Sequence, residues 1–336
     1  MGILPASRAA LLAAAVSIGT PVGAQQAATP PIPLEQAQPA GPATELGPVE
    51  GWIKVRYSVL ADGTTTNVHV IDVVPPRFST KETIAAVNHW KFTPAMEGGR
   101  AIDWHNNESA VVFDDPNTPL DPTPPFAQAY QEAVALLQAQ KYDQAKAANE
   151  RLLTTLTGRL HEIGLAETQS ALVSLGLADP RRAYDAIRRA TDPAVVTLVD
   201  DELRQALQIR FGIEIALGRV MDALDTFARL GKLAPPPGGT IAAQAQAIAE
   251  ALKSDAAIRV DGRVDSEPWI HTPSRRTFTL GNIEGAVREI RLECDRRAQV
   301  LPYAADVDWT LPPGWGACTI LVDAQKNTSF KLYEFK

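Results

Sequence analysis

The stretch GWIKVRYSV, residues 51–59, alternates apolar and polar side chains and predicts a β-strand with one buried face. Its odd-numbered positions from Ile53 to Val59 are apolar, whereas Lys54 and Arg56 fall on the opposite face. Because successive strand residues point to opposite faces, the odd-numbered side chains are expected to form a core. A small sheet is therefore expected around this strand.

The sequence after this strand supplies the other parts of a small α/β unit. Residues 62–63, Asp-Gly, favour a hairpin turn, and a second apolar strand follows at residues 68–71. Residues 79–82, Ser-Thr-Lys-Glu, form a capping box that opens a short helix. The helix ends in residues 90–95, Trp-Lys-Phe-Thr-Pro-Ala, because Pro94 cannot continue it.

This order of elements, closed by a Gly98-Gly99 turn and a last strand at residues 109–113, resembles the C-terminal domain of TonB-family energy transducers. The resemblance covers only a minor part of the chain. The matching residues are Gly51, Val55, Tyr57, Val59, Asp62, Gly63, Val68, Val70, Ala86, Val87, Trp90, Phe92, Pro94, Ala95, Gly99 and Ile102. The aromatic residues in this pattern support the fold, and they do not mark a binding site.

The resemblance implies that the domain recruits an extended peptide of an outer-membrane receptor by strand addition. An edge strand offers unpaired backbone N–H and C=O groups, which an incoming strand satisfies. The last strand is the expected edge, and its residues are Asn107, Glu108, Ser109, Ala110, Val111, Val112 and Phe113. Non-enzymatic binding of envelope proteins is therefore the expected function.

The first 24 residues have the pattern of a secretory signal peptide. Arg8 supplies the positive start, residues 9–18 are apolar, and residues 22–24, Val-Gly-Ala, form a small-residue cleavage site. The apolar run is too short to cross a bilayer as a helix, and no later stretch is long and apolar enough. We expect a periplasmic protein without a stable membrane span; an uncleaved anchor in the inner membrane is the alternative.

The pattern along the chain predicts an α+β multidomain protein. Residues 25–48, rich in Pro, Ala and Gln, and residues 116–125 are expected linkers on either side of the TonB-like α/β sandwich domain at residues 49–115. Helical periodicity runs through residues 126–253, and short alternating strands occupy residues 257–336. The expected architecture is thus a small α/β domain, a helical repeat-like middle and an all-β C-terminal domain.

Small residues recur in the helical region at a spacing close to that of a repeat protein. Ala145, Ala183 and Ala223 follow similar segments, and small residues at such positions let the second helix of a pair approach the first closely. This pattern resembles degenerate tetratricopeptide repeats. An ordinary helical bundle without a binding groove is the alternative.

Cys294 and Cys318 are the only cysteines, and each falls on the apolar phase of an alternating strand. In an oxidising compartment an even pair predicts a disulfide, which suits a small β domain. A redox or metal role is the alternative, but the pair lacks C-x-x-C spacing.

The sequence offers little that points to catalysis. The 336 residues carry a formal net charge of −7 without a basic run, which argues against nucleic acid as a partner. The five histidines are at positions 69, 89, 105, 161 and 271, without metal-ligand spacing. His105 could pair with Glu108, while Asp114-Asp115 and Asp200-Asp201-Glu202 are expected to be structural. No enzyme, metal or cofactor is therefore predicted.

Three departures from the TonB family argue against full energy transduction. The hydrophobic start resembles a cleaved signal, Leu46-Gly47-Pro48 replaces the family's Tyr-Pro element, and a long chain follows Phe113. The leading hypothesis is a periplasmic protein that binds envelope partners, including TonB-dependent receptors, through the TonB-like module and a helical array. The rivals are a divergent membrane-anchored transducer for receptor-mediated transport and a scaffold that uses only the helical groove.

Overall fold

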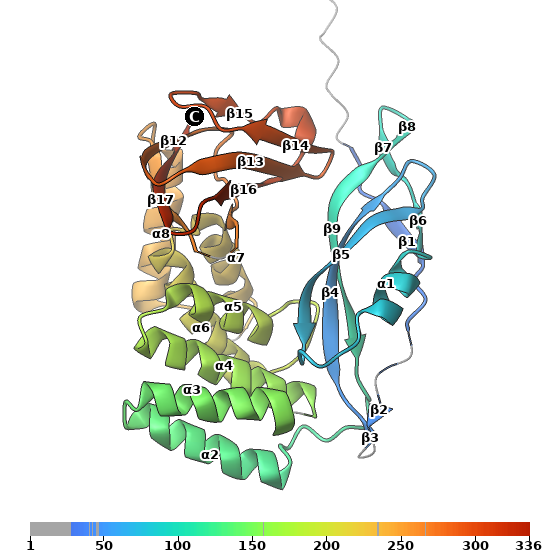
Figure 1. Ribbon diagram of the computed structural model, residues 1–336, viewed down its shortest axis with the longest axis vertical. Helices are drawn as coiled ribbons and strands as arrows, with labels where there is room; N and C mark the ends of the chain where they lie inside the picture. The colour runs from blue at the N-terminus through green and yellow to red at the C-terminus, as the bar shows by residue number, and fades with distance from the viewer. Residues whose placement is uncertain are drawn as a thin grey trace, which may run out of the picture.

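The computed structural model describes residues 28–39, 41, 43–44, 47–156, 158–233, 235–265 and 267–336. The expected signal peptide lies outside the described residues. An N-terminal sheet, a stack of helices and a C-terminal β sandwich follow one another along the chain, as Figure 1 shows. The predicted fold class is confirmed.

The N-terminal sheet has three antiparallel strands in the order β5-β4-β9. They are β4 (Gly51–Val59), β5 (Thr65–Val74) and β9 (Trp104–Phe113). Helix α1 (Lys81–Val87) covers the face formed by the odd-numbered residues of β4. The core on this face contains Ile53, Val55, Tyr57, Val59, Phe78, Val87, Trp90, Phe92 and Val111. The alternation read from residues 51–59 thus gives the buried face correctly.

The Asp62-Gly63 turn joins β4 to β5 and also contacts the backbone of Phe92. Gly63 has a φ of +82°, and a Cβ atom there would lie 2.1 Å from the carbonyl oxygen of Phe92. The Phe92 N–H in turn donates to the Gly63 carbonyl oxygen at 2.9 Å. Glycine is therefore required both by the backbone conformation and by this close approach.

The start of α1 differs from the predicted capping box. The Ser79 hydroxyl donates to the Glu82 carboxylate at 2.5 Å, and the side chain of the N-cap residue Thr80 makes no capping hydrogen bond. The prediction of a helix start was right, but these side chains bond to each other instead of to the backbone.

Short strands join the stretch expected to be a linker to the N-terminal domain. Strand β1 (Ile32–Glu35) pairs with β6 (Lys91–Thr93), and the Trp90 indole N–H donates to the Ala37 carbonyl oxygen at 3.0 Å. The remaining short strands are β2 (Ala43–Thr44), β3 (Gly47–Pro48), β7 (Ala95–Glu97) and β8 (Arg100–Ile102). Ile32 and Leu34 are exposed, so β1 is held through its backbone. Its sequence has no apolar periodicity from which a strand could be predicted.

The middle of the chain consists of helical hairpins. The helices are α2 (Pro124–Gln138), α3 (Tyr142–Arg151), α4 (Leu160–Gly176), α5 (Pro180–Ala190), α6 (Asp200–Ala216), α7 (Val220–Leu230) and α8 (Gly239–Lys253). A short π-helical segment, Leu152–Leu156, extends α3. Ala145, Ala183 and Ala223 lie on the second helix of each hairpin and are 0% exposed, as close helix packing requires.

The three hairpin turns share one geometry. Gln140, Ala178 and Gly218 each have a φ between 56° and 68°. In each turn the next residue donates its N–H to the carbonyl oxygen five positions earlier, as from Lys141 to Leu136. This is the hydrogen bond of a Schellman motif, which satisfies carbonyl groups at a helix end. The hairpins therefore repeat in backbone conformation as well as in sequence spacing.

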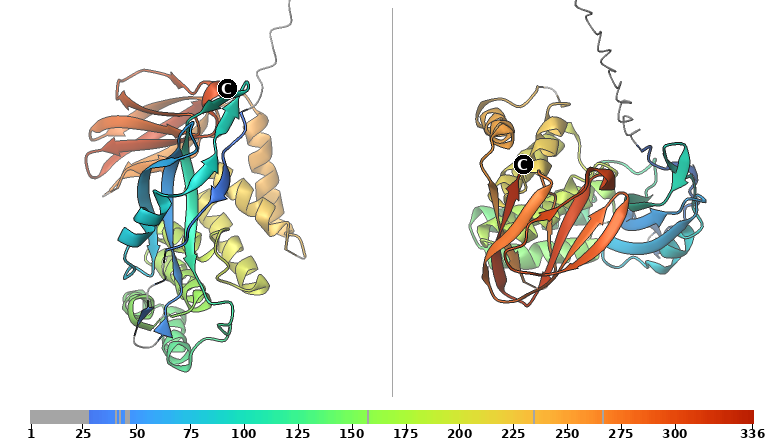
Figure 2. Two further views of the ribbon diagram at one scale, coloured as in Figure 1. Left: turned by 90° about the vertical axis from the view of Figure 1, so that its right-hand side faces the viewer. Right: turned by 90° about the horizontal axis from the view of Figure 1, so that it is seen from above.

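The C-terminal β sandwich has two four-stranded antiparallel sheets, in the orders β10-β17-β12-β15 and β11-β16-β13-β14. The strands are β10 (Ile258–Val264), β11 (Trp269–His271), β12 (Thr277–Glu284), β13 (Val287–Cys294), β14 (Arg297–Pro302), β15 (Trp309–Thr310), β16 (Cys318–Ala324) and β17 (Thr328–Phe335). Figure 2 shows the sandwich at one end of the helices and beside the N-terminal sheet.

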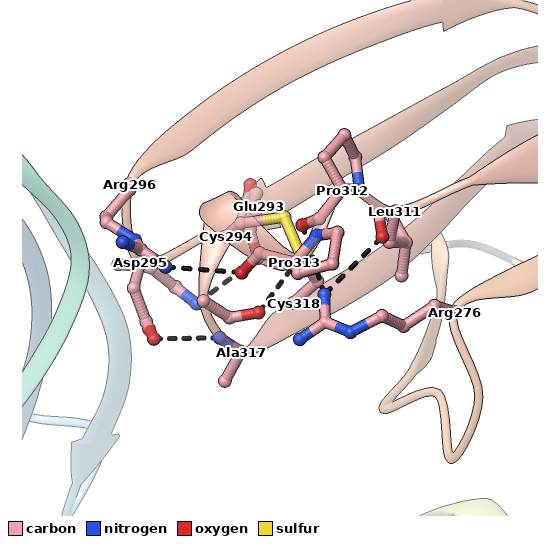
Figure 3. The surroundings of a disulfide bond; sticks show 12 residues. Arg276, Glu293, Cys294, Asp295, Arg296, Leu311, Pro312, Pro313, Ala317 and Cys318 are labelled. Carbon is pink, nitrogen blue, oxygen red and sulfur yellow. Dashed lines mark hydrogen bonds between the residues drawn. A yellow bond between two sulfur atoms is a disulfide. The ribbon is translucent and has the colours of Figure 1, made fainter. Parts of the chain in front are cut away.

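The predicted disulfide is confirmed. Cys294 and Cys318 are opposite one another on β13 and β16, with an S–S distance of 2.01 Å (Figure 3). Beside it, the Asp295 N–H donates to the Ala317 carbonyl oxygen at 3.0 Å, and the Ala317 N–H donates to the Asp295 carboxylate at 2.8 Å. The bridge and these bonds together fix the turn that follows β13.

Candidate functional site

Strand β9 lies at one edge of the N-terminal sheet. On one side it pairs with β4, in a register that runs from Gly51 opposite Phe113 to Val59 opposite Trp104. On its other side no strand is paired with it within the described parts of the chain. The residues predicted as a binding edge, 107–113, are therefore on an edge strand, and their use in binding remains a prediction.

The side chains of this edge alternate between the two faces of the sheet. Val111 and Phe113 belong to the core beneath α1, and the Ser109 hydroxyl lies 3.0 Å from the hydroxyl of Tyr57. Burial raises the pKa of Tyr57, and the hydrogen bond to Ser109 only partly opposes this effect. Ala110 contacts the apolar cluster on the opposite face. Side chains on both faces of β9 are therefore packed.

The first part of β9 is closed by the β sandwich. The His105 N–H donates to the Asp295 carbonyl oxygen at 2.5 Å, and the Asn106 side-chain amide lies 3.5 Å from the Glu293 carbonyl oxygen. Asn106 has a φ of +56°, at an irregularity in the β4–β9 register. The outer edge is thus divided into a covered part around His105 and a part from Asn107 onward.

Ion pairs hold the sandwich against the same end of the sheet. Arg56 contacts Glu293 at 2.5 Å and Glu108 at 2.8 Å. Arg296, in the turn after β13, contacts Glu97 at 2.5 Å. These ion pairs join the N-terminal domain to β13 and the turn after it, so charge complementarity helps to hold this turn beside β9.

The suggested pairing of His105 with Glu108 is wrong. The His105 Nδ1 lies 3.2 Å from the Ser58 hydroxyl, whereas Glu108 contacts Lys54 and Arg56. Two basic residues on the neighbouring strand compete successfully for the carboxylate. Local sequence spacing could not show this cross-strand arrangement.

The second face of the N-terminal sheet packs on the helices. Trp52 is 0% exposed and shares an apolar cluster with Ile163 and Val195. Around it, Lys54 contacts Asp192, and Arg188 contacts Asp72, each at 2.8 Å. The sequence analysis did not predict this interface. Trp52, a large apolar residue on the otherwise polar face of β4, was the available signal.

Two of the remaining histidines lie within hydrogen-bonding distance of a carboxylate. His161 lies 2.8 Å from Glu202, and buried His271 lies 2.5 Å from buried Glu334. Ser274 also donates to Glu334. Burial works against ionisation of Glu334, but the hydrogen bonds from His271 and Ser274 outweigh it and lower the pKa. His271 and Ser274 thus both donate to the buried carboxylate of Glu334, and such a hydrogen-bond network stabilises the fold.

The described residues contain no group of three or more His, Cys, Asp or Glu side chains that could hold a metal ion. None of their helices combines the length and apolar character that crossing a bilayer requires. The open backbone edge of β9 is a candidate site for a partner strand.

Comparison with known proteins identifies the domain that carries this edge. Residues 47–113 match the family described as "Gram-negative bacterial TonB protein C-terminal". Protein TonB of Pseudomonas aeruginosa is 30% identical over 73 residues, which are 22% of this chain and 19% of that protein. The chain thus spans less than a fifth of that relative's length.

A solved structure is also similar to part of the chain. The solution NMR structure of the Pseudomonas aeruginosa TonB CTD is 26% identical, and the match covers 26% of this chain and 90% of that one, with a TM-score of 0.23. Residues 47–113 form a TonB C-terminal domain.

Proposed function

We propose that the protein is a non-enzymatic partner-binding protein of the bacterial envelope, which recruits an extended segment of another envelope protein by strand addition to β9. The observation that carries this proposal is the outer edge of β9 from Asn107 to Phe113, which has no strand beside it in the described chain. Backbone N–H and C=O groups on such an edge are satisfied by an incoming strand. The helical hairpins and β sandwich serve as the scaffold that holds this edge.

The contact at His105 limits where the incoming strand fits. Because the Asp295 carbonyl already accepts from His105, a partner strand has its full set of backbone sites only from Asn107 onward. The described part of the N-terminal segment pairs with β6 and leaves this edge unpaired. A segment of about seven residues therefore fits the open part of β9 at one residue opposite each position.

A pair of proline variants tests the proposal. Neighbouring strand residues point their N–H groups to opposite sides, so of Ser109 and Ala110 one donates to β4 and the other points outward. Ser109→Pro and Ala110→Pro are compared for thermal unfolding and for capture of outer-membrane proteins by the full chain. We expect the variant that remains stable to lose its partner, since proline on an edge removes only the outward donor.

A third proline variant controls for a general effect of an edge proline. Val300 is 55% exposed on β14, the edge strand of its sheet, and Val300→Pro should keep the partner. Retention of the partner by the β9 proline variant that remains stable would contradict the proposal. That result would favour the rival scaffold, in which the helical surface alone binds.

The membrane-anchored alternative concerns residues outside the described part of the chain. Sequencing the N-terminus of the protein recovered from the envelope separates the two versions. A start at Gln25 supports the cleaved, periplasmic form, and an intact Met1 start supports the anchored transducer.

A further inference from the structure

A pocket opens where β9 ends, and strand addition to β9 does not explain it. It has a volume of about 630 Å³ and is bounded by the segment after β9, the start of α4 and the segment that leads into α6. The acidic pairs Asp114-Asp115 and Asp200-Asp201, which the sequence leaves in separate segments, both line it. The fold thus gathers these carboxylates on one concave surface.

The walls of the pocket are fixed by hydrogen bonds. The buried Glu50 carboxylate accepts from the Asp115 N–H at 3.2 Å and from the Leu160 N–H at 2.7 Å. His161 bonds to the Leu120 carbonyl oxygen at 2.5 Å and to Glu202 at 2.8 Å. These bonds tie all three segments together, so the pocket is preformed.

Apolar side chains remain uncovered on this surface. Val196 is 85% exposed and Leu120 is 65% exposed, and both line the pocket. Large apolar side chains that stay exposed on a fixed concave surface favour an apolar contact with a ligand.

The charge of the pocket selects the kind of ligand. Asp114, Asp200 and Asp201 form no ion pair with any residue that the structure describes. Arg159, a basic residue of the lining, donates instead to the carbonyl oxygens of Pro119 and Asp121. These three carboxylates outnumber the single Arg159 guanidinium, so the net charge of this group is negative and complementary to a cation.

We propose that this pocket binds a basic peptide segment in which an aliphatic or aromatic residue lies next to lysine or arginine. The apolar side chain contacts Val196 and Leu120, and the cationic group lies among Asp114, Asp200 and Asp201. This site goes beyond the proposed function, because it recognises the side chains of its ligand. Strand addition to β9 depends on the backbone of the partner instead.

The test measures fluorescence anisotropy of a labelled peptide in which lysines flank a leucine, with the full chain. A peptide with glutamates in place of the lysines should not bind. Val196→Ser should weaken binding about threefold or more through lost apolar contact. Combining Asp200→Asn with Asp201→Asn should weaken binding about fivefold or more at low salt, and added salt should reduce that difference.

Matched variants elsewhere separate this site from general surface effects. Val300→Ser removes an exposed valine from β14, and the pair Asp306→Asn and Asp308→Asn removes two exposed acids from the loop after β14. Both should leave peptide binding unchanged. Equal loss in these controls, or equal binding of the lysine and glutamate peptides, would overturn the proposal.

The acids at the start of α6 could act only on the helix, because carboxylates in a first turn offset the macrodipole. In that case the Asp200→Asn and Asp201→Asn variants would lower stability and leave peptide affinity unchanged, which also overturns the proposal. Whichever of Ser109→Pro and Ala110→Pro remains stable should retain lysine-peptide binding, so this site and the β9 edge fail or succeed separately.

Discussion

The main-chain N–H of His105 donates a hydrogen bond of 2.5 Å to the carbonyl oxygen of Asp295 and so joins β9 to the β sandwich. The bond lies beside the ion pair of Arg56 with Glu293. A turn of the sandwich therefore occupies a backbone site that a longer partner strand would need. Two neighbouring interactions, one of backbone and one of charge, set the end of the open edge.

Reversing the charge of Glu293 should release this contact. In Glu293→Lys two cations face each other, and the His105 N–H should exchange with solvent about tenfold faster, which corresponds to about 1.4 kcal/mol. Hydrogen–deuterium exchange of the segment around His105 measures the effect. Glu267→Lys, a charge reversal at an exposed position of the sandwich, is the control and should leave the rate unchanged. An unchanged rate in Glu293→Lys would show that the ion pair does not hold the turn.

Removing the disulfide should destabilise the β sandwich. Cys294 and Cys318 are separated by 24 positions, and closing a loop of that length stabilises a fold by about 3 to 4 kcal/mol on the chain-entropy model. Cys294→Ser combined with Cys318→Ser should lower the denaturation midpoint of the sandwich accordingly. Urea unfolding followed by tryptophan fluorescence, to which Trp269 in the sandwich core contributes, measures this change. A midpoint equal to that of the unaltered chain would contradict it.

The shared hairpin turns predict opposite effects of glycine at equivalent positions. Gln140 and Ala178 are exposed residues with positive φ, so Gln140→Gly and Ala178→Gly should each stabilise by about 0.5 to 1 kcal/mol. Gly218→Ala should destabilise, because its Cβ atom would also lie 3.0 Å from Val260. Thermal unfolding of the three variants checks the pattern. A loss of stability in both glycine variants would mean that the turns are not equivalent.

The Glu334 network predicts acid sensitivity of the sandwich. The pKa of Glu334 is lower in the folded protein than the ordinary value of about 4.3, so the unfolded chain takes up the proton first as the pH falls. The carboxylate of Glu334 therefore contributes its full stabilisation to the free energy of unfolding at neutral pH. This stabilisation is lost as the pH falls from the ordinary glutamate range through the lowered pKa of the folded protein. Glu334→Gln should lower the free energy of unfolding by about 1 to 3 kcal/mol at pH 7 and should make stability depend less on acidic pH.

Urea midpoints measured between neutral and acidic pH test this dependence. Glu267→Gln, at an exposed glutamate of the same domain, should retain the acid dependence of the unaltered chain. An unchanged slope in Glu334→Gln would assign the acid sensitivity to other carboxylates.

The sequence was most informative where burial imposes a period on the side chains. Alternation predicted β4 and the strands around Cys294, because one face of each lies in a core. The edge position of β9 came from the resemblance and not from its own residues. Strand β1 was missed, because it is held by backbone pairing and its apolar side chains stay exposed.

Contacts between the parts of the chain were beyond prediction for a different reason. Lys54 and Arg56 look like solvated residues in the sequence, and only the fold brings Asp192 and Glu293 to them. The pocket beside β9 is similar, since its acids come from distant segments. Such sites depend on relative placement, which residue spacing does not encode.

The antiparallel pairing of β4 with both β5 and β9 also has a mechanical meaning. A polypeptide lying along β9 and pulled parallel to its own axis would load the transverse hydrogen bonds of the sheet together, in shear. Pulled sideways, it would break them one after another, as a zipper opens. The force needed to detach such a polypeptide should therefore depend on the direction of pulling and be greatest along the strands.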